Sequence, residues 1–365
     1  MQAVKRALSV GLVLWLLTGC AGTPPRSEKQ SPKLAAAQIS ELTSRAESPA
    51  QLGIDVTIDH GRLLAAREVN ELSTTTSVTV QLIGPPMNAT AGVGAPYRVP
   101  CILATINGHG GQRVILDSGS NRIVLGYSLA ATLEIPLIVG LDPVPAQGMG
   151  GQGKVSGYWA VVPQMNVGDL KLRRLMALVV PDAEVLTYRR SFWGNEQVML
   201  VGVSGLRKLS YLSLDYLRGV VTFGAAEKYL PDATATFATA VPLRWESELP
   251  TVDAVLERQY RTSCVVDTGG DYGLVLSRAA ATELGYWKPG WGSEETSRGI
   301  AGEEEGKGYI VHEVKVGEAI LRQVPARARA AGPEALGGRV LLGNYELRQY
   351  RVTFDFQRNV LWLER

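Results

Sequence analysis

The chain has 365 residues, of which 45% are hydrophobic and 20% are charged. This length and composition allow one large buried core or two smaller ones. The 37 basic and 35 acidic residues nearly balance, so the composition lacks the excess positive charge of a nucleic-acid-binding protein. The three histidines are scattered without metal-ligand spacing, and neither a metal nor a cofactor is expected.

The first 19 residues are predicted to be a lipoprotein signal peptide and not part of the fold. Two basic residues precede an apolar run, Leu8 to Leu17, that is too short to span a bilayer comfortably. The run ends in Leu17-Thr18-Gly19-Cys20, which resembles the lipobox of bacterial lipoproteins. The resemblance implies cleavage before Cys20 and acylation of its sulfur, which would tether the protein to a membrane. Because Ala21 follows the cysteine, we expect the outer membrane, on the side facing the periplasm. The alternative is an ordinary signal peptide.

Residues 20–75 are expected to be an acylated cysteine and a flexible tether. Residues 21 to about 50 are rich in Ala, Ser, Pro, Glu and Lys and poor in large apolar residues. Ser77 to Ile83 then alternates apolar and polar residues like a half-buried strand. The next two predicted strands and the turn between them are Tyr97–Ile106, Asn107-Gly108 and Gln112–Leu116.

Two short motifs organise the rest of the chain. Val114 to Ser120 reads Val-Ile-Leu-Asp-Ser-Gly-Ser, and Cys264 to Gly270 reads Cys-Val-Val-Asp-Thr-Gly-Gly. In each motif an apolar run, typical of a buried strand, ends on a carboxylate, a hydroxyl residue and a glycine. A buried Asp needs a partner. Each strand is therefore expected to present its carboxylate, Asp117 or Asp267, to a functional partner.

The same series of features follows each motif, so the chain contains an internal repeat. Each half continues with an apolar strand, a short helix, a glycine-rich turn, two apolar residues with a glycine, and a pair of closing strands. The helices are predicted to start at the N-caps Ser128 and Ser277. The glycine-rich turns lie at residues 147–153 and 299–302, and the apolar–apolar–Gly triplets at residues 200–202 and 341–343.

The repeat predicts two β lobes, residues 76–230 and residues 231–365, each with one Asp motif. The boundary lies in the Ala- and Thr-rich stretch Ala225–Pro242, and an insertion around Leu186–Gln197 accounts for the greater length of the first half. Short strands, frequent turns and brief helices make the chain mostly β. Two similar halves with one Asp each indicate two carboxylates that meet across a pseudo-twofold axis.

Asp117-Ser118-Gly119-Ser120 and Asp267-Thr268-Gly269-Gly270, each with its later apolar–apolar–Gly triplet, resemble the aspartic proteases of the pepsin and retroviral type. The half-repeats are most similar to the retropepsin-like bacterial group, here fused in tandem. The resemblance covers roughly residues 75–365. It implies a bilobal pepsin-like acid protease fold, in which two pseudo-twofold-related β lobes carry short helices.

The resemblance also implies a role for the residues of the two loops. Asp117 and Asp267 are expected to be the catalytic pair that shares one water. Ser118 and Thr268 are expected to cross-link the two loops by hydrogen bonds beneath the pair. The remaining loop residues are expected to support the carboxylates: they are Gly119 and Gly269, which allow close approach, and Ser120, whose hydroxyl donates to the outer oxygen of Asp117.

Two departures from the family pattern are visible. Gly270 cannot donate a side-chain hydrogen bond to Asp267, which leaves the second carboxylate with less support. The first glycine-rich turn, expected to be a flap over the substrate, lacks the tyrosine of the pepsin flap. The expected flap and substrate-binding residues are Gly148, Met149, Gly150, Gly151, Ile300, Ala301 and Gly302.

Two carboxylates about 3 Å apart cannot both ionise cheaply, so the pair holds a single proton. The ionised member can take a proton from water while the protonated member hydrogen-bonds the carbonyl of a peptide. The predicted function is therefore a membrane-anchored, monomeric aspartic endopeptidase that acts on a peptide or protein substrate. The alternative is a peptide-binding or envelope-scaffold lipoprotein that keeps the cleft without turnover.

Three further alternatives make testable demands on the structure. A glycosidase needs its two carboxylates about 5 Å apart or more. The spacing Gly148-x-Gly150-x-x-Gly153 also fits a dinucleotide fingerprint, but that motif needs a following helix, and Lys154–Val162 is strand-like. Cys101 and Cys264 could form a disulfide in an oxidising compartment. We expect that they do not, because their positions relative to the two Asp motifs differ.

Overall fold

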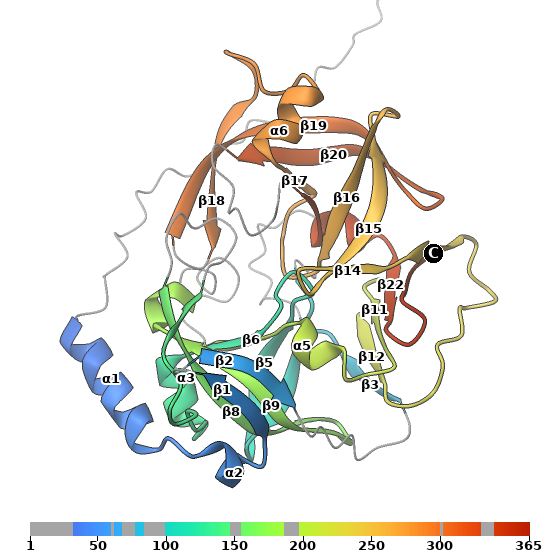
Figure 1. Cartoon of the computed structure of the whole chain (residues 1–365). Coiled ribbons are helices and arrows are strands. Elements are labelled where there is room, and N and C mark those ends of the chain that lie inside the picture. Colours follow the sequence, from blue (N-terminus) through green and yellow to red (C-terminus); the bar gives the residue numbers. More distant parts are fainter. Residues whose placement is uncertain are drawn as a thin grey trace, which may run out of the picture.

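The computed structural model describes residues 32–59, 62–67, 77–83, 99–146, 155–185, 197–299, 302–329 and 339–365. These residues are mostly β strands with a few short helices, as the sequence predicted. The strands form three large sheets and one separate two-stranded sheet. Figure 1 shows the sheet of the second half above that of the first, with strands β11, β12 and β22 at one side.

Seven strands of the first half form one sheet. In hydrogen-bonded order they are β4 (Cys101–Ile106), β5 (His109–Leu116), β10 (Val198–Val201), β6 (Ile123–Gly126), β9 (Leu170–Val180), β8 (Val155–Val167) and β7 (Val144–Ala146). An additional pairing between β4 and β8 curls the sheet back on itself. Asn107 and Gly108 form the predicted hairpin turn between β4 and β5, and both have a positive φ, 48° and 85°, as a two-residue hairpin turn requires.

Eight strands of the second half form another sheet. In order they are β14 (Arg244–Glu246), β15 (Leu249–Leu256), β16 (Tyr260–Asp267), β21 (Val340–Gly343), β17 (Leu274–Leu276), β20 (Ala319–Arg329), β19 (Gly302–Val316) and β18 (Ser293–Gly299). Apart from the edge strand β14, this order matches the first sheet strand for strand, including the pairing of β15 with β19. The parallel partners also correspond, β10 with β5 and β21 with β16. The sequence repeat is therefore a repeat of topology.

A third sheet takes three strands from each half. Its order is β13 (Ala238–Pro242), β23 (Val360–Glu364), β22 (Arg351–Asp355), β11 (Tyr211–Asp215), β12 (Val220–Gly224) and β3 (Val78–Gln81). The two halves meet where β11 and β22 pair antiparallel, with Ser213 opposite Thr353. The Thr353 hydroxyl donates to the Ser213 hydroxyl at 2.8 Å, and both side chains are buried. This sheet joins the chain on either side of the expected boundary at residue 230.

The remaining described elements are short. They are the helices α1 (Pro32–Ser44), α2 (Pro49–Leu52), α3 (Tyr127–Thr132), α5 (Val203–Leu206), α6 (Arg278–Glu283) and α7 (Asn344–Leu347), and the hairpin of β1 (Asp55–Asp59) and β2 (Arg62–Arg67). None of the helices in the described ranges has the length and apolar character to cross a bilayer. Helix α6 starts as predicted, with the Ser277 hydroxyl accepting from the Ala280 N–H at 3.1 Å.

Helix α3 differs from the prediction, because its N-cap is Gly126 and not Ser128. The Asp182 carboxylate reaches the start of this helix, accepts from the Ser128 N–H at 2.9 Å and also accepts from its hydroxyl. A side chain at position 126 would overlap that carboxylate. An acceptor distant in the sequence thus replaces the local cap.

The N-terminal segment also differs from the flexible tether expected over residues 20–75, wherever the structure describes it. Helix α1 packs against α3, with Leu42 buried in the main core. Helix α2 begins with a capping box, in which the side chains of Ser48 and Gln51 each accept from the backbone N–H of the other residue. The Ala-rich stretch has strong helix propensity, and its few apolar residues suffice to dock it. Cys20 lies outside the described residues.

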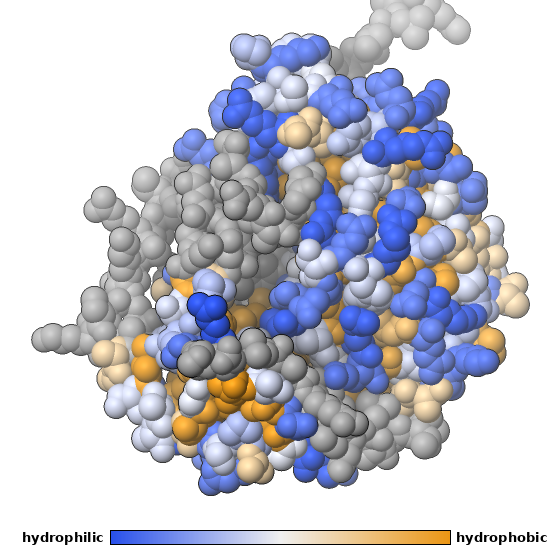
Figure 2. Space-filling model, viewed as in Figure 1, coloured by the Kyte–Doolittle hydropathy of each residue, from blue (hydrophilic) through white to orange (hydrophobic). Residues whose placement is uncertain are grey.

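The largest hydrophobic core runs through all three sheets. It includes Leu116 and Leu212 from the first half and Val266 and Phe354 from the second. A second cluster, which includes Leu52, lies between the N-terminal segment and the first sheet. In the face seen in Figure 2, hydrophilic residues predominate over the second half and hydrophobic ones gather over the first. The core therefore supports both Asp motifs on one packed framework.

Candidate active site

The two motif aspartates lie at corresponding places in the two sheets. Asp117 follows directly after β5, and Asp267 is the last residue of β16. Each lies beside the apolar–apolar–Gly triplet of its own half: the Asp117 N–H donates to Val201, and Asp267 is in register with Gly343. A side chain at Gly202 or Gly343 would overlap the backbone of the loop that follows the Asp. The two features that recur in the sequence are thus direct neighbours in space.

The hydroxyl residues after the aspartates join the two loops. The Ser118 N–H donates to the Thr268 hydroxyl at 3.0 Å, and the Thr268 N–H donates to the Ser118 hydroxyl at 3.0 Å. Each hydroxyl then donates across the junction to a strand carbonyl, Ser118 to Val266 and Thr268 to Leu116, both at 2.7 Å. Both side chains are buried. These four reciprocal hydrogen bonds fix the position of one loop relative to the other.

The next two glycines let the carboxyl groups meet. The Gly119 N–H donates to Asp117 and the Gly269 N–H donates to Asp267, each at 2.9 Å. A side chain at Gly119 would overlap the carboxyl group of Asp267, and one at Gly269 would overlap that of Asp117. Each carboxyl therefore packs on the backbone of the opposite loop, and the two carboxyls hydrogen-bond each other.

This contact changes the ionisation of both groups. Burial, followed by the charge of Asp267, holds the pKa of Asp117 well above its ordinary value. Burial also raises the pKa of Asp267, although hydrogen bonds from Tyr272 and Asp117 oppose the rise. Because the two groups interact strongly, their protons leave as those of one pair. The arrangement can hold a single proton between two carboxyls.

Ser120 does not make the side-chain hydrogen bond that the resemblance implied. Its hydroxyl donates to the Arg122 carbonyl at 2.8 Å. Only its backbone N–H donates to the Asp117 carboxyl. In the second half, the hydroxyl of Tyr272 donates to the outer oxygen of Asp267. Sequence reasoning missed Tyr272, because it lies outside the motif and its counterpart in the first half is Arg122. The only signal was an aromatic residue two positions after the departure at Gly270.

The two glycine-rich segments connect the strands of corresponding pairs in the chain. In the first half β7 and β8 pair antiparallel as far as Ala146 and Val155. In the second half β18 and β19 pair as far as Gly299 and Gly302, so Gly302 begins β19. The other expected flap residues lie outside the described residues; they are Gly148, Met149, Gly150, Gly151, Ile300 and Ala301.

Two alternative readings disagree with the described structure. The dinucleotide reading required a helix after the first glycine-rich turn, but β8 (Val155–Val167) follows it. A glycosidase requires separated carboxyls, whereas Asp117 and Asp267 hydrogen-bond each other. Within the described ranges, no group of three or more His, Cys, Asp or Glu residues could hold a metal ion.

The two cysteines are buried on different sheets, Cys101 on β4 and Cys264 on β16. No disulfide joins them, as expected from their unequal positions in the repeat. Burial raises the pKa of the Cys264 thiol to about 12. A thiol of this kind packs as a small apolar side chain and is a poor nucleophile.

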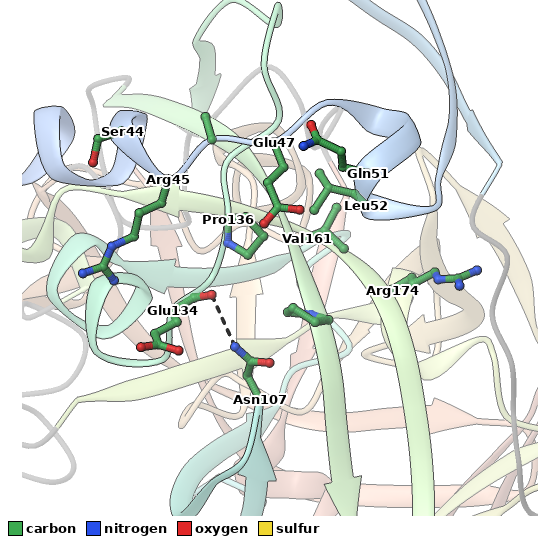
Figure 3. Close-up of a pocket in the computed structure, with 12 residues that line it drawn as sticks. Ser44, Arg45, Glu47, Gln51, Leu52, Asn107, Glu134, Pro136, Val161 and Arg174 are labelled. Atoms are coloured by element: carbon green, nitrogen blue, oxygen red, sulfur yellow. Dashed lines mark hydrogen bonds between the residues drawn. The ribbon is translucent and has the colours of Figure 1, made fainter.

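A cavity of about 700 Å³ lies between the N-terminal segment and the first sheet (Figure 3). Arg45 and Glu47 line it from the N-terminal segment, and Asn107, Glu134 and Arg174 line it from the first half. The Asn107 amide donates to the Glu134 carbonyl at 3.3 Å (Figure 3). Its lining includes neither motif aspartate nor any residue of the two Asp loops. The cavity is therefore separate from the candidate active site.

Comparison with known proteins agrees with this geometry. Residues 102–204 match a family model described as aspartyl protease. The matched segment runs from β4 into α5 and contains Asp117, its loop and the triplet Leu200-Val201-Gly202 at the end of β10. A search of curated proteins found no match. The family match supports an aspartyl protease family and, with it, a peptidase.

Proposed function

We propose that this protein is an aspartic endopeptidase that hydrolyses peptide bonds with a water activated between Asp117 and Asp267. The observation that supports this most directly is the set of reciprocal hydrogen bonds through Ser118 and Thr268. They hold two carboxyls against each other, that of the half-buried Asp117 and that of the buried Asp267. Two carboxyls in direct contact can share one proton, which is the arrangement that this chemistry needs.

The proposal includes a bilobal, pepsin-like arrangement with lobes at residues 76–230 and 231–365 related by a pseudo-twofold axis. The matching strand order of the two large sheets supports it. The antiparallel pairing of β11 with β22, at the centre of the third sheet, is where such an axis would pass. Because one chain supplies both aspartates, a monomer is sufficient for the site.

The reaction follows from the shared proton. The ionised carboxylate accepts a proton from the water, whose oxygen attacks the amide carbon. The protonated carboxyl donates its proton to the carbonyl oxygen, so charge does not build up on that oxygen. The carboxyl that took the proton from water then donates it to the amide nitrogen, while the other carboxylate takes a proton from a hydroxyl of the tetrahedral intermediate. The carbon–nitrogen bond breaks, and an amine and a carboxylic acid leave. Asp117 and Asp267 return to their starting state, with one proton between them.

We propose an extended peptide or protein segment as the substrate. The hairpins β7–β8 and β18–β19 end at corresponding positions in their sheets. Their glycine-rich tips, which include the expected flap residues, would pair with the substrate backbone as an added strand. Specificity would then come from side-chain pockets along that strand.

We also propose that Cys20 carries the lipid anchor, after removal of residues 1–19, on the periplasmic side of the outer membrane. The lipobox-like sequence supports this. Metabolic labelling with a clickable fatty acid tests it. The parent should be labelled and sediment with membranes, whereas Cys20→Ala should be unlabelled. Label retained in Cys20→Ala would contradict the anchor.

The activity is tested with a mixed peptide library at several pH values, using the parent, Asp117→Asn and Asp267→Asn. The parent should cleave peptides, and each variant should lose at least about 1,000-fold in rate, because either change removes the shared proton. The control Asp253→Asn changes an exposed aspartate of β15 that pairs with Arg244. Retained peptide affinity without cleavage by the parent would instead identify a peptide-binding protein.

A further inference from the structure

The outer oxygens of the two aspartates have different partners. Asp117 accepts hydrogen bonds from the backbone N–H groups of Gly119 and Ser120, and its hydrogen bond with Asp267 is one in which Asp267 is the acceptor. Asp267 receives the equivalent backbone bonds and, in addition, the hydroxyl of Tyr272 on its outer oxygen. The two halves of the site are therefore alike in backbone and unlike in side-chain support.

The ring of Tyr272 fills a space made by two glycines. A side chain at Gly270 would overlap the ring edge and Cζ of Tyr272. One at Gly343 would overlap both the carbonyl and the ring of the same tyrosine. The missing hydroxyl at position 270 and the tyrosine at position 272 are consequently linked: a serine or threonine at 270 would exclude the ring that replaces it.

Two arginines of β20 act on the Tyr272 hydroxyl. The guanidinium of Arg327 lies 5.1 Å from the ring centroid, and the positive charges of Arg329 and Arg327 act to lower the pKa of the Tyr272 hydroxyl. Burial and the charge of Asp267 nevertheless hold the pKa of Tyr272 well above its ordinary value. The hydroxyl is therefore protonated at every physiological pH and is a permanent donor.

The counterpart of Tyr272 in the first half points elsewhere. Arg122 forms an ion pair with Glu248 at 2.7 Å, and its guanidinium lies 5.9 Å from the ring centroid of Trp159. The Ser120 hydroxyl donates to the Arg122 carbonyl and not to Asp117. The first half thus has no equivalent of the tyrosine among the contacts that the structure describes for Asp117.

We propose that Tyr272 is a positioning residue that makes the carboxyl pair asymmetric. Its hydroxyl stabilises negative charge on Asp267, so Asp267 is the member that takes the proton from water. Asp117 holds the shared proton and donates it to the carbonyl oxygen of the substrate. After the water adds, Asp267 carries the new proton and Asp117 is ionised. The catalytic part of this inference depends on the peptidase function proposed above.

A carboxyl titration tests the inference without relying on turnover. The full-length protein is labelled with ¹³C at the Asp carboxyl carbons, and Asp117→Asn and Asp267→Asn assign the two signals. In the parent, Asp267 should stay ionised to a lower pH than Asp117. In Tyr272→Phe, which keeps the ring, the midpoint of Asp267 should move up by about one pH unit, because a charge-assisted hydrogen bond is lost. Unchanged midpoints in folded Tyr272→Phe overturn the proposal.

Two further variants separate positioning from simple stability. Tyr286→Phe removes another tyrosine–carboxylate hydrogen bond, to Glu257, away from the dyad. It should leave the Asp267 midpoint unmoved, and an equal shift in this variant would overturn the inference. Tyr272→Ala frees the space beside position 270, so adding Gly270→Ser should lower the Asp267 midpoint again. If the double variant has the same Asp267 midpoint as Tyr272→Ala alone, the Tyr272 hydroxyl does not replace a hydroxyl at position 270, and that part of the proposal is wrong.

Cleavage assays then address the reaction. Tyr272→Phe should lose about 10- to 100-fold in kcat, with the lower limb of its pH profile shifted upward and little change in KM. A rise in KM with kcat unchanged would assign Tyr272 to substrate binding and contradict the positioning role. If the parent cleaves nothing while the titration behaves as expected, the peptidase proposal fails and the asymmetry of the carboxyl pair stands.

Discussion

At the scale of single residues, the candidate site depends on backbone that comes unusually close to a charged group. The carboxyl group of Asp267 packs against the Cα atom of Gly119, and that of Asp117 packs against the Cα atom of Gly269. The hydroxyls of Ser118 and Thr268 hold those glycines in place. The geometry of the carboxyl pair is thus set by four residues that are not themselves titratable.

We predict that Gly119→Ala abolishes the contact between the carboxyls. The new methyl group would occupy the place of the Asp267 carboxyl, so cleavage should fall by about 100-fold or more. Gly110→Ala is the control, because the nearest atom to its added methyl is the Thr105 hydroxyl at 3.9 Å. Parallel cleavage assays check this, and an active Gly119→Ala enzyme would refute the packing described here.

A second residue-scale prediction concerns Glu346 on α7, just after the Gly343 triplet. Burial raises the pKa of Glu346 to about 7 from an ordinary value of 4.5. The folded state then binds more protons than the unfolded state between these values, so the stability from this group is complete below 4.5 and is lost as pH rises through about 7. Urea denaturation across this range should show Glu346→Gln losing less stability than the parent. The control Glu318→Gln, at an exposed residue, should show the same dependence of stability on pH as the parent. If Glu346→Gln also shows the parent's dependence, the raised pKa of Glu346 does not contribute to stability.

At the scale of elements, local sequence determined some features and distant contacts determined others. The Asp loops could be predicted, because an apolar run, a carboxylate and a glycine at positions 117 and 267 are a local signal that recurs. The cap of α3 could not, since Asp182 reaches it from the end of another strand. Tyr272 was missed for the same reason, because its role requires the space left by Gly270.

The N-terminal segment gives an element-scale prediction. Leu42 on α1 is 1% exposed, within the main core. Leu42→Ala should therefore cost about 2–4 kcal/mol of unfolding free energy, while cleavage per folded molecule stays unchanged. Leu230→Ala, at a leucine that is 79% exposed, should change stability by less than about 0.5 kcal/mol. Equal stabilities of the two variants in urea denaturation would show that α1 is not docked in solution.

At the scale of the whole molecule, the two halves share more than the carboxyl pair. The third sheet takes strands from both, and one hydrophobic core includes Leu212 of the first half and Phe354 of the second. The halves thus pack together as one unit, although each half also has its own large sheet and the two large sheets have matching strand orders. This sharing places the two Asp loops, which are far apart in sequence, on one packed framework.

We therefore predict a single cooperative thermal transition for the full chain. Unfolding of one half would expose the core surface of the other, so the two halves should lose near-UV and far-UV dichroism together. Thr353→Val, which leaves the buried Ser213 hydroxyl without its partner, should lower the midpoint of that one transition by several degrees. Two separate transitions in the parent would contradict a shared core.

The central claim is that Asp117 and Asp267 act together on a carbonyl that becomes tetrahedral. The most direct test is the affinity of a peptide analogue with a hydroxyl-bearing tetrahedral carbon in place of the scissile carbonyl, measured by calorimetry against the matching plain peptide. We predict that the parent binds the analogue at least about 100-fold more tightly. This preference should disappear in both Asp117→Asn and Asp267→Asn. Equal affinity for analogue and plain peptide in the parent would contradict the account.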